Sequence, residues 1–323
     1  MNKVSIILPT FNRIHLLRET LNSIFFQNYE NWECIIVDDD STENVFQIVQ
    51  EFILKDSRFV YYSRPENLPK GANSCRNYGF EKASGNFIQW FDSDDIMLED
   101  FLSTKLNEFT EDLEMVITSG YFWNSKKETK EAIELVNSDI HLFEDFIQWK
   151  IKILTPSVLF RKSFLNGKRL FDTSIKRGQE AEFFSRIFFN LEKSKFKIKS
   201  KYLFLYRQHT DSITSENTSY NSEYKNSSLF ILSENFKRAE QIKSSILLDY
   251  LNKQIINLFF LSIQNNDSSL AKKIINTNFQ TLTKYGIMKS LEMIVIGKIL
   301  VAITFPSFTF QKRWKNFSFN WNE

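Results

Sequence analysis

The sequence predicts an α/β protein with a mostly parallel sheet and flanking helices, followed by a helical C-terminal region. Short apolar runs alternate with amphipathic helical patterns through the first hundred residues. Such alternation favours parallel strands joined by right-handed crossovers. Between residues 217 and 300 the pattern is mostly helical, and its only glycines are Gly286 and Gly297. We therefore place a boundary near residue 216 and expect domains at 1–216 and 217–323.

The predicted elements follow in the order strand, helix, strand, helix, strand, helix, strand. The apolar runs that predict the strands occupy residues 3–9, 32–38, 59–63 and 86–92. Apolar residues at helical spacing indicate the first helix: Ile14, Leu17, Leu21 and Ile24. The same spacing indicates the second helix: Val45, Ile48, Val49 and Phe52. A third helix fits residues 71–83. Residues 101–216 are mixed and predict no clear order.

Composition bounds the class of protein. The chain has 323 residues, 42% of them hydrophobic, which is enough for one large or two ordinary domains. Cys34 and Cys75 lie in apolar or helical surroundings, which favours reduced, buried thiols over a disulfide framework. The apolar run before Pro9 has only five residues, too few for the core of a signal peptide. We therefore expect a cytoplasmic protein.

Chemically rich loops follow the first four predicted strands. They occupy residues 9–13, 38–42, 64–71 and 92–95, and combine carboxylates with an aromatic ring and basic groups. In an open parallel sheet, ligands bind beyond the carboxyl ends of the strands. The four loops therefore predict one site for an anionic ligand with a divalent cation.

The fourth loop, "DSDD", places three carboxylates at the end of a strand that reads as buried. Like charges raise one another's energy, so this crowding favours a shared cation or proton. A calcium loop of the EF-hand type is excluded, because Ile96, Met97 and Ser103 stand where a ligand, a glycine and a glutamate are needed. The sequence also has no Gly-x-Gly-x-x-Gly or Walker A motif, which disfavours dinucleotide and P-loop enzymes.

Two of these loops have simpler interpretations. Ser41 or Thr42 would cap the next helix, as such residues commonly do. Phe11 is one of 33 phenylalanines, and most phenylalanines are core residues.

Residues 4–13, 16–42 and 70–95 resemble the nucleotide-sugar-binding half of a family 2 glycosyltransferase with the GT-A fold. The resemblance implies a Rossmann-like sheet and a nucleoside-diphosphate-sugar donor, with Asp39 accepting a hydrogen bond from the base. It implies the following nucleotide-sugar-binding residues: Pro9, Thr10, Phe11, Asn12, Arg13, Asp39, Arg76, Asp92, Ser93 and Arg207. It also implies that Asp92, Asp94 and His209 hold a divalent cation, Mn²⁺ or Mg²⁺, on the diphosphate.

Residues 177–188 resemble the family segment that supplies the catalytic base. The family's Glu-Asp pair is Gln179-Glu180 here, so the resemblance implies Glu180 as the base and Glu182 as the alternative. Both acids would also suit a solvated helix N-terminus, because acidic side chains there favour the helix dipole.

The C-terminal tail is both basic and apolar. Residues 271–323 contain eight Lys or Arg against two Glu, and residues 287–310 are strongly apolar with no uncharged stretch long enough to span a bilayer. Basic residues mixed with Trp314, Phe317, Phe319 and Trp321 suit a membrane headgroup region. Packing on the protein or on a second copy is equally open. The chain lacks a motif for nucleic acid.

Together these features predict a metal-dependent, inverting sugar transferase that uses a nucleoside-diphosphate sugar, UDP-linked by preference. The expected acceptor is a glycan or lipid-linked glycan, in bacterial surface polysaccharide synthesis at the inner membrane face. The catalytic domain would be 1–216. The rivals are a nucleotidyltransferase, which should have a glycine in the loop at 9–13, and a non-catalytic sugar-nucleotide-binding relative.

Overall fold

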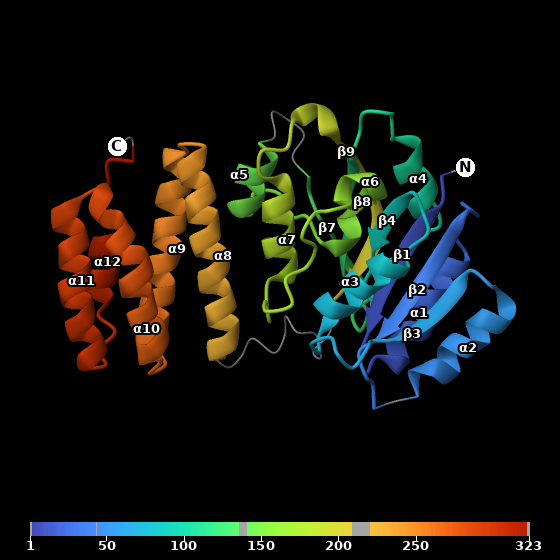
Figure 1. The fold of residues 1–323 in the computed structure, drawn as a ribbon, viewed down its shortest axis with the longest axis horizontal. Coiled ribbons are helices and arrows are strands. Elements are labelled where there is room, and N and C mark those ends of the chain that lie inside the picture. The colour runs from blue at the N-terminus through green and yellow to red at the C-terminus, as the bar shows by residue number, and fades with distance from the viewer. Residues whose placement is uncertain (1, 43, 136–140, 209–219, 322–323) are drawn as a thin grey trace. The chain divides into compact units, whose positions relative to one another are not determined.

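The computed structural model describes residues 2–42, 44–135, 141–208 and 220–321 (Figure 1). The chain forms two compact units. The N-terminal unit comprises Met1–Thr173 and Arg186–Glu216, and the C-terminal unit comprises Ser174–Ser185 and Asn217–Glu323. Helix α7 (Gln179–Phe188) therefore begins in the C-terminal unit and ends in the N-terminal unit.

The first half of the N-terminal unit alternates strands with helices, as predicted. Its elements are β1 (Val4–Thr10), α1 (Ile14–Phe25), β2 (Trp32–Asp38), α2 (Val45–Lys55), β3 (Phe59–Ser63), α3 (Ala72–Lys82) and β4 (Phe87–Trp90). These four strands are parallel and lie in the order β3-β2-β1-β4. The predicted α/β class with flanking helices is therefore confirmed, but only these four strands form the parallel sheet that the sequence predicts.

The second half of the N-terminal unit extends the sheet, which becomes mixed. Its elements are β5 (Ile96–Met97), α4 (Phe101–Asn107), β6 (Met115–Asn124), β7 (Thr129–Ala132), α5 (Leu142–Ile147), β8 (Val158–Arg161), α6 (Lys162–Leu165) and β9 (Phe196–Arg207). Strand β8 runs antiparallel between β4 and β6, while β9 pairs parallel with β6 and antiparallel with β5. The carboxyl end of β9 is thereby brought beside the acidic loop that follows β4.

Both faces of the parallel strands are buried. On β1, Val4, Ile6 and Leu8 belong to the core cluster that includes apolar residues of α1 and α2. The opposite face of the sheet receives α3, where a side chain at Gly79 would collide with Ile7 of β1. Strands buried on both faces read as continuous apolar runs, which explains why the sequence shows them so clearly. The close approach of α3 sets its N-terminus beside the ends of these strands.

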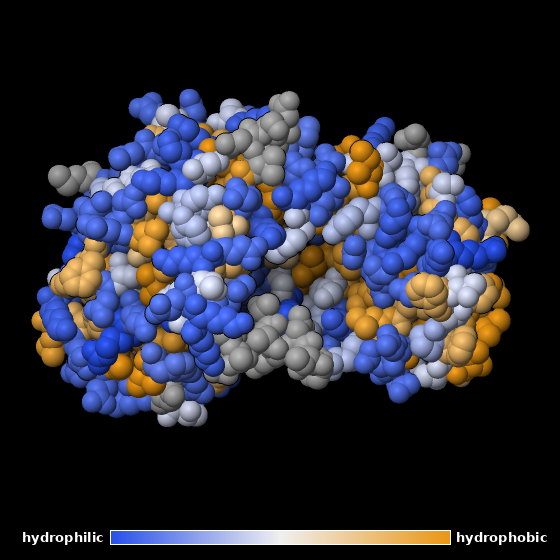
Figure 2. Space-filling view, turned by 180° about the vertical axis from the view of Figure 1, so that it is seen from behind, coloured by the Kyte–Doolittle hydropathy of each residue, from blue (hydrophilic) through white to orange (hydrophobic). Residues whose placement is uncertain are grey.

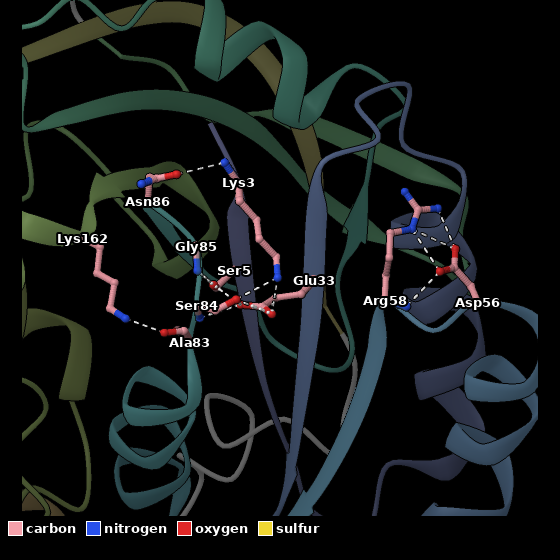
Figure 3. Close-up of polar contacts among 10 residues, drawn as sticks. All are labelled: Lys3, Ser5, Glu33, Asp56, Arg58, Ala83, Ser84, Gly85, Asn86 and Lys162. Atoms are coloured by element: carbon pink, nitrogen blue, oxygen red, sulfur yellow. Dashed lines mark hydrogen bonds and ion pairs between the residues drawn. The ribbon is translucent and has the colours of Figure 1, made fainter. Parts of the chain in front are cut away.

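A polar network joins the first strands at the amino end of the sheet (Figure 3). Glu33 of β2 accepts hydrogen bonds from Lys3 Nζ at 2.7 Å, from Ser5 Oγ at 2.6 Å and from Ser84 N at 2.7 Å. Burial raises the pKa of Glu33, but these hydrogen bonds outweigh it and lower the pKa to about 2. The network therefore holds Glu33 ionised and fastens β1, β2 and the start of β4 together.

The C-terminal unit is helical in its described residues, as predicted. Besides the start of α7, its helices are α8 (Ser222–Gln241), α9 (Ser245–Gln264), α10 (Ser268–Ile274), α11 (Ile287–Ala302) and α12 (Phe308–Lys315). In four of these helices, the side chain of the N-cap residue accepts a hydrogen bond from a backbone N–H group. These residues are Asn221, Ser244, Asp267 and Ser307. Trp314 is fully buried among Phe259, Phe260 and Phe279. Phe319 is buried too, so the expectation that these two aromatic residues suit a membrane headgroup region is wrong.

Helix α9 is long and apolar enough to cross a membrane, and it alone among the described helices meets both conditions. Most of its length is buried inside the protein. Its buried residues, which include Leu251, Ile255 and Phe259, supply the centre of the helical core. We therefore interpret α9 as a core helix.

Candidate active site

The loops after β1 and β2 are held together by hydrogen bonds. The backbone N–H of Asn12 donates to Ser41 Oγ at 2.9 Å, and that of Thr42 donates to Asn12 Oδ1 at 2.9 Å. Ser41 Oγ donates in turn to Asp38 Oδ1 at 2.5 Å. The residue that caps α2 is Asn44, so the alternative role of Ser41 or Thr42 as the helix cap is wrong. Ser41 and Thr42 instead hold the loops after β1 and β2 together through their hydrogen bonds with Asn12.

Asp39 is held by an arginine from the loop after β3. Arg64 Nε lies 2.5 Å from Asp39 Oδ1, and both side chains are more than nine-tenths buried. The same guanidinium donates to the carbonyl oxygens of Pro65 and Leu68 at 3.1 and 2.6 Å. Because Arg64 binds these carbonyl oxygens as well as Asp39, it holds the Asp39 carboxylate in a fixed position at the end of β2.

Phe11 stands outside the core, contrary to the simpler interpretation of its sequence. Its side chain is 41% exposed in the loop after β1. The ammonium group of Lys70, from the loop before α3, lies 4.3 Å from the centre of the Phe11 ring. An exposed ring with a cation beside it at the carboxyl edge of the sheet can stack on a planar ligand.

The acidic loop after β4 meets arginines from two other elements. Arg76 Nη2 on α3 lies 2.7 Å from Asp92 Oδ1, and the Arg76 side chain is buried. Arg13 Nε, from the loop after β1, lies 3.9 Å from Asp94 Oδ2. Both carboxylates keep about a fifth of their side-chain surface exposed. They are therefore accessible to a ligand while two arginines balance part of their charge.

Arg207 closes the site from the end of β9. Its backbone N–H donates to Asp95 Oδ1 at 2.9 Å, and its Nε donates to the carbonyl oxygen of Asp94 at 2.8 Å. Its Nη2 pairs with Glu19 of α1 at 2.6 Å. The guanidinium also lies 4.4 Å from the centre of the Trp123 ring. Arg207 thus supports the backbone of the acidic loop and is itself buried.

The carboxyl group of Asp95 is fully buried. Its Oδ2 atom has no hydrogen-bond partner among the described residues. Burial raises its pKa well above the usual range, and Asp94 and Asp92 raise it further, whereas the N–H of Arg207 acts in the opposite direction. The neighbouring carboxylates and the burial of Asp95 therefore disfavour its ionised form.

The remaining predicted nucleotide-binding residues occupy the same edge. Pro9 and Thr10 end β1, and Thr10 is only 3% exposed, with a hydroxyl that has no partner among the described residues. Ser93 is also buried, and its carbonyl oxygen accepts from Thr20 Oγ1 of α1 at 3.0 Å. All ten predicted nucleotide-sugar-binding residues thus lie at or beside the carboxyl edge of one sheet.

The candidate base lies in the C-terminal unit. Glu180 and Glu182 are in the first turn of α7, which follows Gly178 with its positive φ of 76°. Glu182 is only 2% exposed, whereas Glu180 is half-buried. His209, the third predicted metal ligand, lies outside the described residues.

The described residues provide carboxylates for a cation without forming a complete metal cage. They contain no cluster of three or more His, Cys, Asp or Glu side chains positioned to hold a metal. Asp92 and Asp94 nevertheless lie in the same short loop, separated by one residue, and both side chains are partly exposed. Mg²⁺ and Mn²⁺ take few protein carboxylates when phosphate oxygens and water complete their shell, so these residues fit such an ion.

Two contacts of the site could not be read from sequence motifs. Glu19 pairs with Arg207 although the two residues are 188 positions apart. The sequence indicates that the loop containing Arg64 is chemically rich. Its contact with Asp39, however, depends on the pairing of β2 with β3, which brings the two loops together. The only available signal for Arg64 was a basic residue immediately after a predicted strand.

The chain is similar in sequence to one class of known proteins. The sequence model described as "Glycosyl transferase family 2" matches residues 5–167. A Campylobacter jejuni GalNAc(5)-diNAcBac-PP-undecaprenol beta-1,3-glucosyltransferase is 33% identical over 171 residues, which are 52% of this chain and 55% of that protein. An Escherichia coli UDP-Glc:alpha-D-GlcNAc-diphosphoundecaprenol beta-1,3-glucosyltransferase, WfgD, is 38% identical over 104 residues, 32% of this chain and 40% of that protein.

Relatives of this kind are matched over only part of their length. An uncharacterized glycosyltransferase of Rickettsia bellii is 30% identical over 55% of this chain but only 25% of its own length. Among solved structures, TarS 1–349 of S. aureus in complex with UDP-GlcNAc superimposes with a TM-score of 0.63 at 17% identity, over 94% of this chain and 91% of that one. At this identity the likeness shows a shared fold.

Proposed function

Because the chain belongs to glycosyl transferase family 2, we propose that it transfers a sugar from a nucleoside-diphosphate sugar to a glycan or lipid-linked acceptor. The observation that supports this most is the meeting of Asp39, Asp92 and Asp94 with three arginines at one edge of the sheet. The exposed ring of Phe11 suits a base, and the acidic loop suits a diphosphate with its cation. A UDP-sugar is the preferred donor.

The loops after β1 and β2 would bind the nucleoside. Asp39 is fixed by Arg64, so its second oxygen can accept a hydrogen bond from an N–H on the base. Phe11, backed by Lys70, provides a face on which a planar base can stack. UDP is named in the WfgD relative and UDP-GlcNAc in the TarS complex, which supports the choice of uracil.

The acidic loop and the arginines beside it would bind the diphosphate. Asp92 and Asp94 would hold Mn²⁺ or Mg²⁺, with His209 as a third ligand. The bound ion would neutralise charge on the leaving diphosphate. Arg13 and Arg76 already lie against these carboxylates and so keep them in place before the donor arrives. A neighbour in fold, a mannosyltransferase from Pyrobaculum calidifontis, was solved with GDP-Man and Mn²⁺.

The acceptor needs a base to remove the proton of its attacking hydroxyl, and we assign that role to Glu180. It is half-buried, whereas the alternative Glu182 is almost fully enclosed and so less accessible to an acceptor. Attack by the hydroxyl on the anomeric carbon, with departure of the nucleoside diphosphate, is one direct displacement. Such a step inverts the anomeric configuration and requires no carboxylate nucleophile.

The setting we propose is bacterial surface polysaccharide synthesis, in the cytoplasm or at the inner face of the cell membrane. The names of the Campylobacter and Escherichia relatives both contain an undecaprenol diphosphate acceptor. A lipid-linked acceptor of that kind is presented at a membrane surface. The enzyme would then extend a glycan while remaining peripheral to the bilayer.

A panel of nucleotide sugars tests the function. The purified protein is mixed with UDP-, GDP- and dTDP-sugars in Mn²⁺ or in chelator, and thermal stabilisation and slow donor hydrolysis are measured. We expect one UDP-sugar to stabilise the protein and to be hydrolysed only in Mn²⁺. Cleavage of nucleoside triphosphates without any response to sugar nucleotides would indicate a nucleotidyltransferase. Binding without hydrolysis or transfer would indicate a non-catalytic relative.

The base assignment has its own test. Glu180→Gln keeps the size of the side chain but cannot take the acceptor's proton, so the transfer rate should fall by about 10² to 10⁴. Affinity for UDP in Mn²⁺ should stay within about twofold. Glu182→Gln is the matched control in the same helical turn. Loss of transfer in Glu182→Gln alone would assign the base to Glu182.

A further inference from the structure

Helix α11 has one apolar face that the C-terminal unit does not cover. Its inner face contributes Met293, Leu300 and Val301 to the core. On the other side, large apolar side chains recur every three or four residues and are between 44% and 76% exposed: Met288, Leu291, Val295 and Ile299. Figure 2 shows hydrophobic surface on this unit, at the right of the view. An exposed apolar stripe of this kind on a helix marks a surface that contacts another protein or a membrane.

The apolar surface continues beyond the end of α11. Ile303 and Phe305, in the connection to α12, are 61% and 57% exposed, and Phe308 at the start of α12 is 76% exposed. Beside α11, a groove of about 530 Å³ is lined by Met288, Leu291 and Val295 together with Arg313 and Phe317 of the following segment. We call α11, the connection and α12 the tail face.

The charges on the tail face are almost all positive. Residues 285–321 contain five Lys or Arg and a single acid, Glu292, for a net charge of +4. Arg313 neutralises that acid with two hydrogen bonds of 2.8 and 2.6 Å. Lys298 and Lys312 are exposed and have no carboxylate partner among the described residues. The apolar side chains are thus accompanied by cations without compensating anions.

We propose that the tail face docks the protein on an anionic phospholipid surface. The exposed apolar side chains would enter the headgroup boundary, and the lysines would attract the lipid charges. A second copy of the chain would bring two positively charged faces together, so charge complementarity favours the lipid. The proposal rests on the proposed function only in its setting, since a docked enzyme would meet a lipid-linked acceptor in the same membrane.

Vesicle flotation of the full-length chain tests the proposal. The vesicles are pure phosphatidylcholine, or phosphatidylcholine mixed with phosphatidylglycerol. We expect the protein to float with the mixed vesicles and to bind them about tenfold more weakly after Leu291→Glu with Ile299→Glu. Lys298→Glu with Lys312→Glu should weaken binding by about 25-fold, because each basic residue near an anionic surface contributes about fivefold.

A matched control comes from the other unit. Leu54 on α2 is 80% exposed, so Leu54→Glu adds charge to an apolar surface residue without touching the tail face. It should bind vesicles like the unchanged protein. Calorimetry with UDP in Mn²⁺ on every variant separates lipid docking from donor binding, and thermal unfolding shows that each variant is folded.

Three results would overturn the proposal. One is an unchanged protein that stays with the soluble fraction at every lipid composition. Another is equal binding by the tail-face variants and Leu54→Glu. The third is a halving of the sedimenting mass by Leu291→Glu with Ile299→Glu in the absence of lipid, which would assign the tail face to contact between copies.

Discussion

The two ends of the sheet in the N-terminal unit hold carboxylates in opposite conditions. At the amino end, Glu33 is surrounded by donors from Lys3, Ser5 and Ser84, and its pKa is about 2 (Figure 3). At the carboxyl end, Asp95 is buried next to Asp94 with one oxygen atom unpartnered, and its pKa is raised. The amino end stabilises the ionised form of its carboxylate, whereas the carboxyl end disfavours the ionised form of Asp95.

This difference separates structural carboxylates from those that serve a ligand. Folding alone selects against crowded, desolvated acids, because each one destabilises the native state. We therefore interpret the arrangement after β4 as serving the charged ligand of the proposed function. The comparison predicts that removing a carboxylate has opposite consequences at the two ends.

The largest effect should come from Asp94→Asn. Removing one of two carboxylates from the cation site should weaken UDP binding in Mn²⁺ by about 100-fold or more. Calorimetry in Mn²⁺ and in chelator measures the change. The matched control is Glu33→Gln at the amino end, which should bind UDP like the unchanged protein. Equal UDP affinity in Mn²⁺ and in chelator for the unchanged protein would remove the metal assignment.

Glu33→Gln should instead affect stability. The amide cannot replace a carboxylate that accepts from an ammonium, two hydroxyls and a backbone N–H, so we expect the free energy of unfolding to fall by roughly 2 kcal/mol. Urea unfolding at neutral pH measures it. A variant as stable as the unchanged protein would mean that the network of Figure 3 contributes no net stability.

The lowered pKa of Glu33 predicts part of the protein's loss of stability in acid. The folded pKa of Glu33, about 2, is below its ordinary value of 4.5, so its stabilisation is complete above pH 4.5 and is lost as the pH falls through 2. The difference in unfolding free energy between the unchanged protein and Glu33→Gln should shrink across this window. Urea titrations at several pH values between 5 and 2 test this, and a constant difference would contradict it.

The smallest effect should come from Asp95→Asn, and its sign should be reversed. A neutral amide removes a buried carboxyl that Asp94 and Asp92 disfavour, while its oxygen can still accept from the N–H of Arg207. We expect the free energy of unfolding at pH 7 to rise by about 1 kcal/mol, which is about 2 to 4 °C in Tm. Differential scanning calorimetry measures it. Destabilisation would show that the charge of Asp95 is needed by the fold.

Much of the N-terminal unit was predictable because its signals are local. A strand buried on both faces must be apolar throughout, and a helix beside it must repeat every three or four residues, so 3–9 and the helix containing Leu17 and Leu21 stand out. The positions of the chemical loops follow from the same alternation. Residues 101–216 gave no such signal, because β8 and β9 insert into the sheet far from their sequence neighbours.

The sequence by itself determined the α/β class, the four loops at one sheet edge and the acidic composition of "DSDD", since each depends on residues close together in the chain. Only the tertiary structure decided which partners meet: Arg64 with Asp39, Arg76 with Asp92, and Arg207 with Glu19. It also decided that α11 leaves an apolar face exposed while α9 buries its own. Pairing and burial depend on which segments pack together, and no local pattern contains that information.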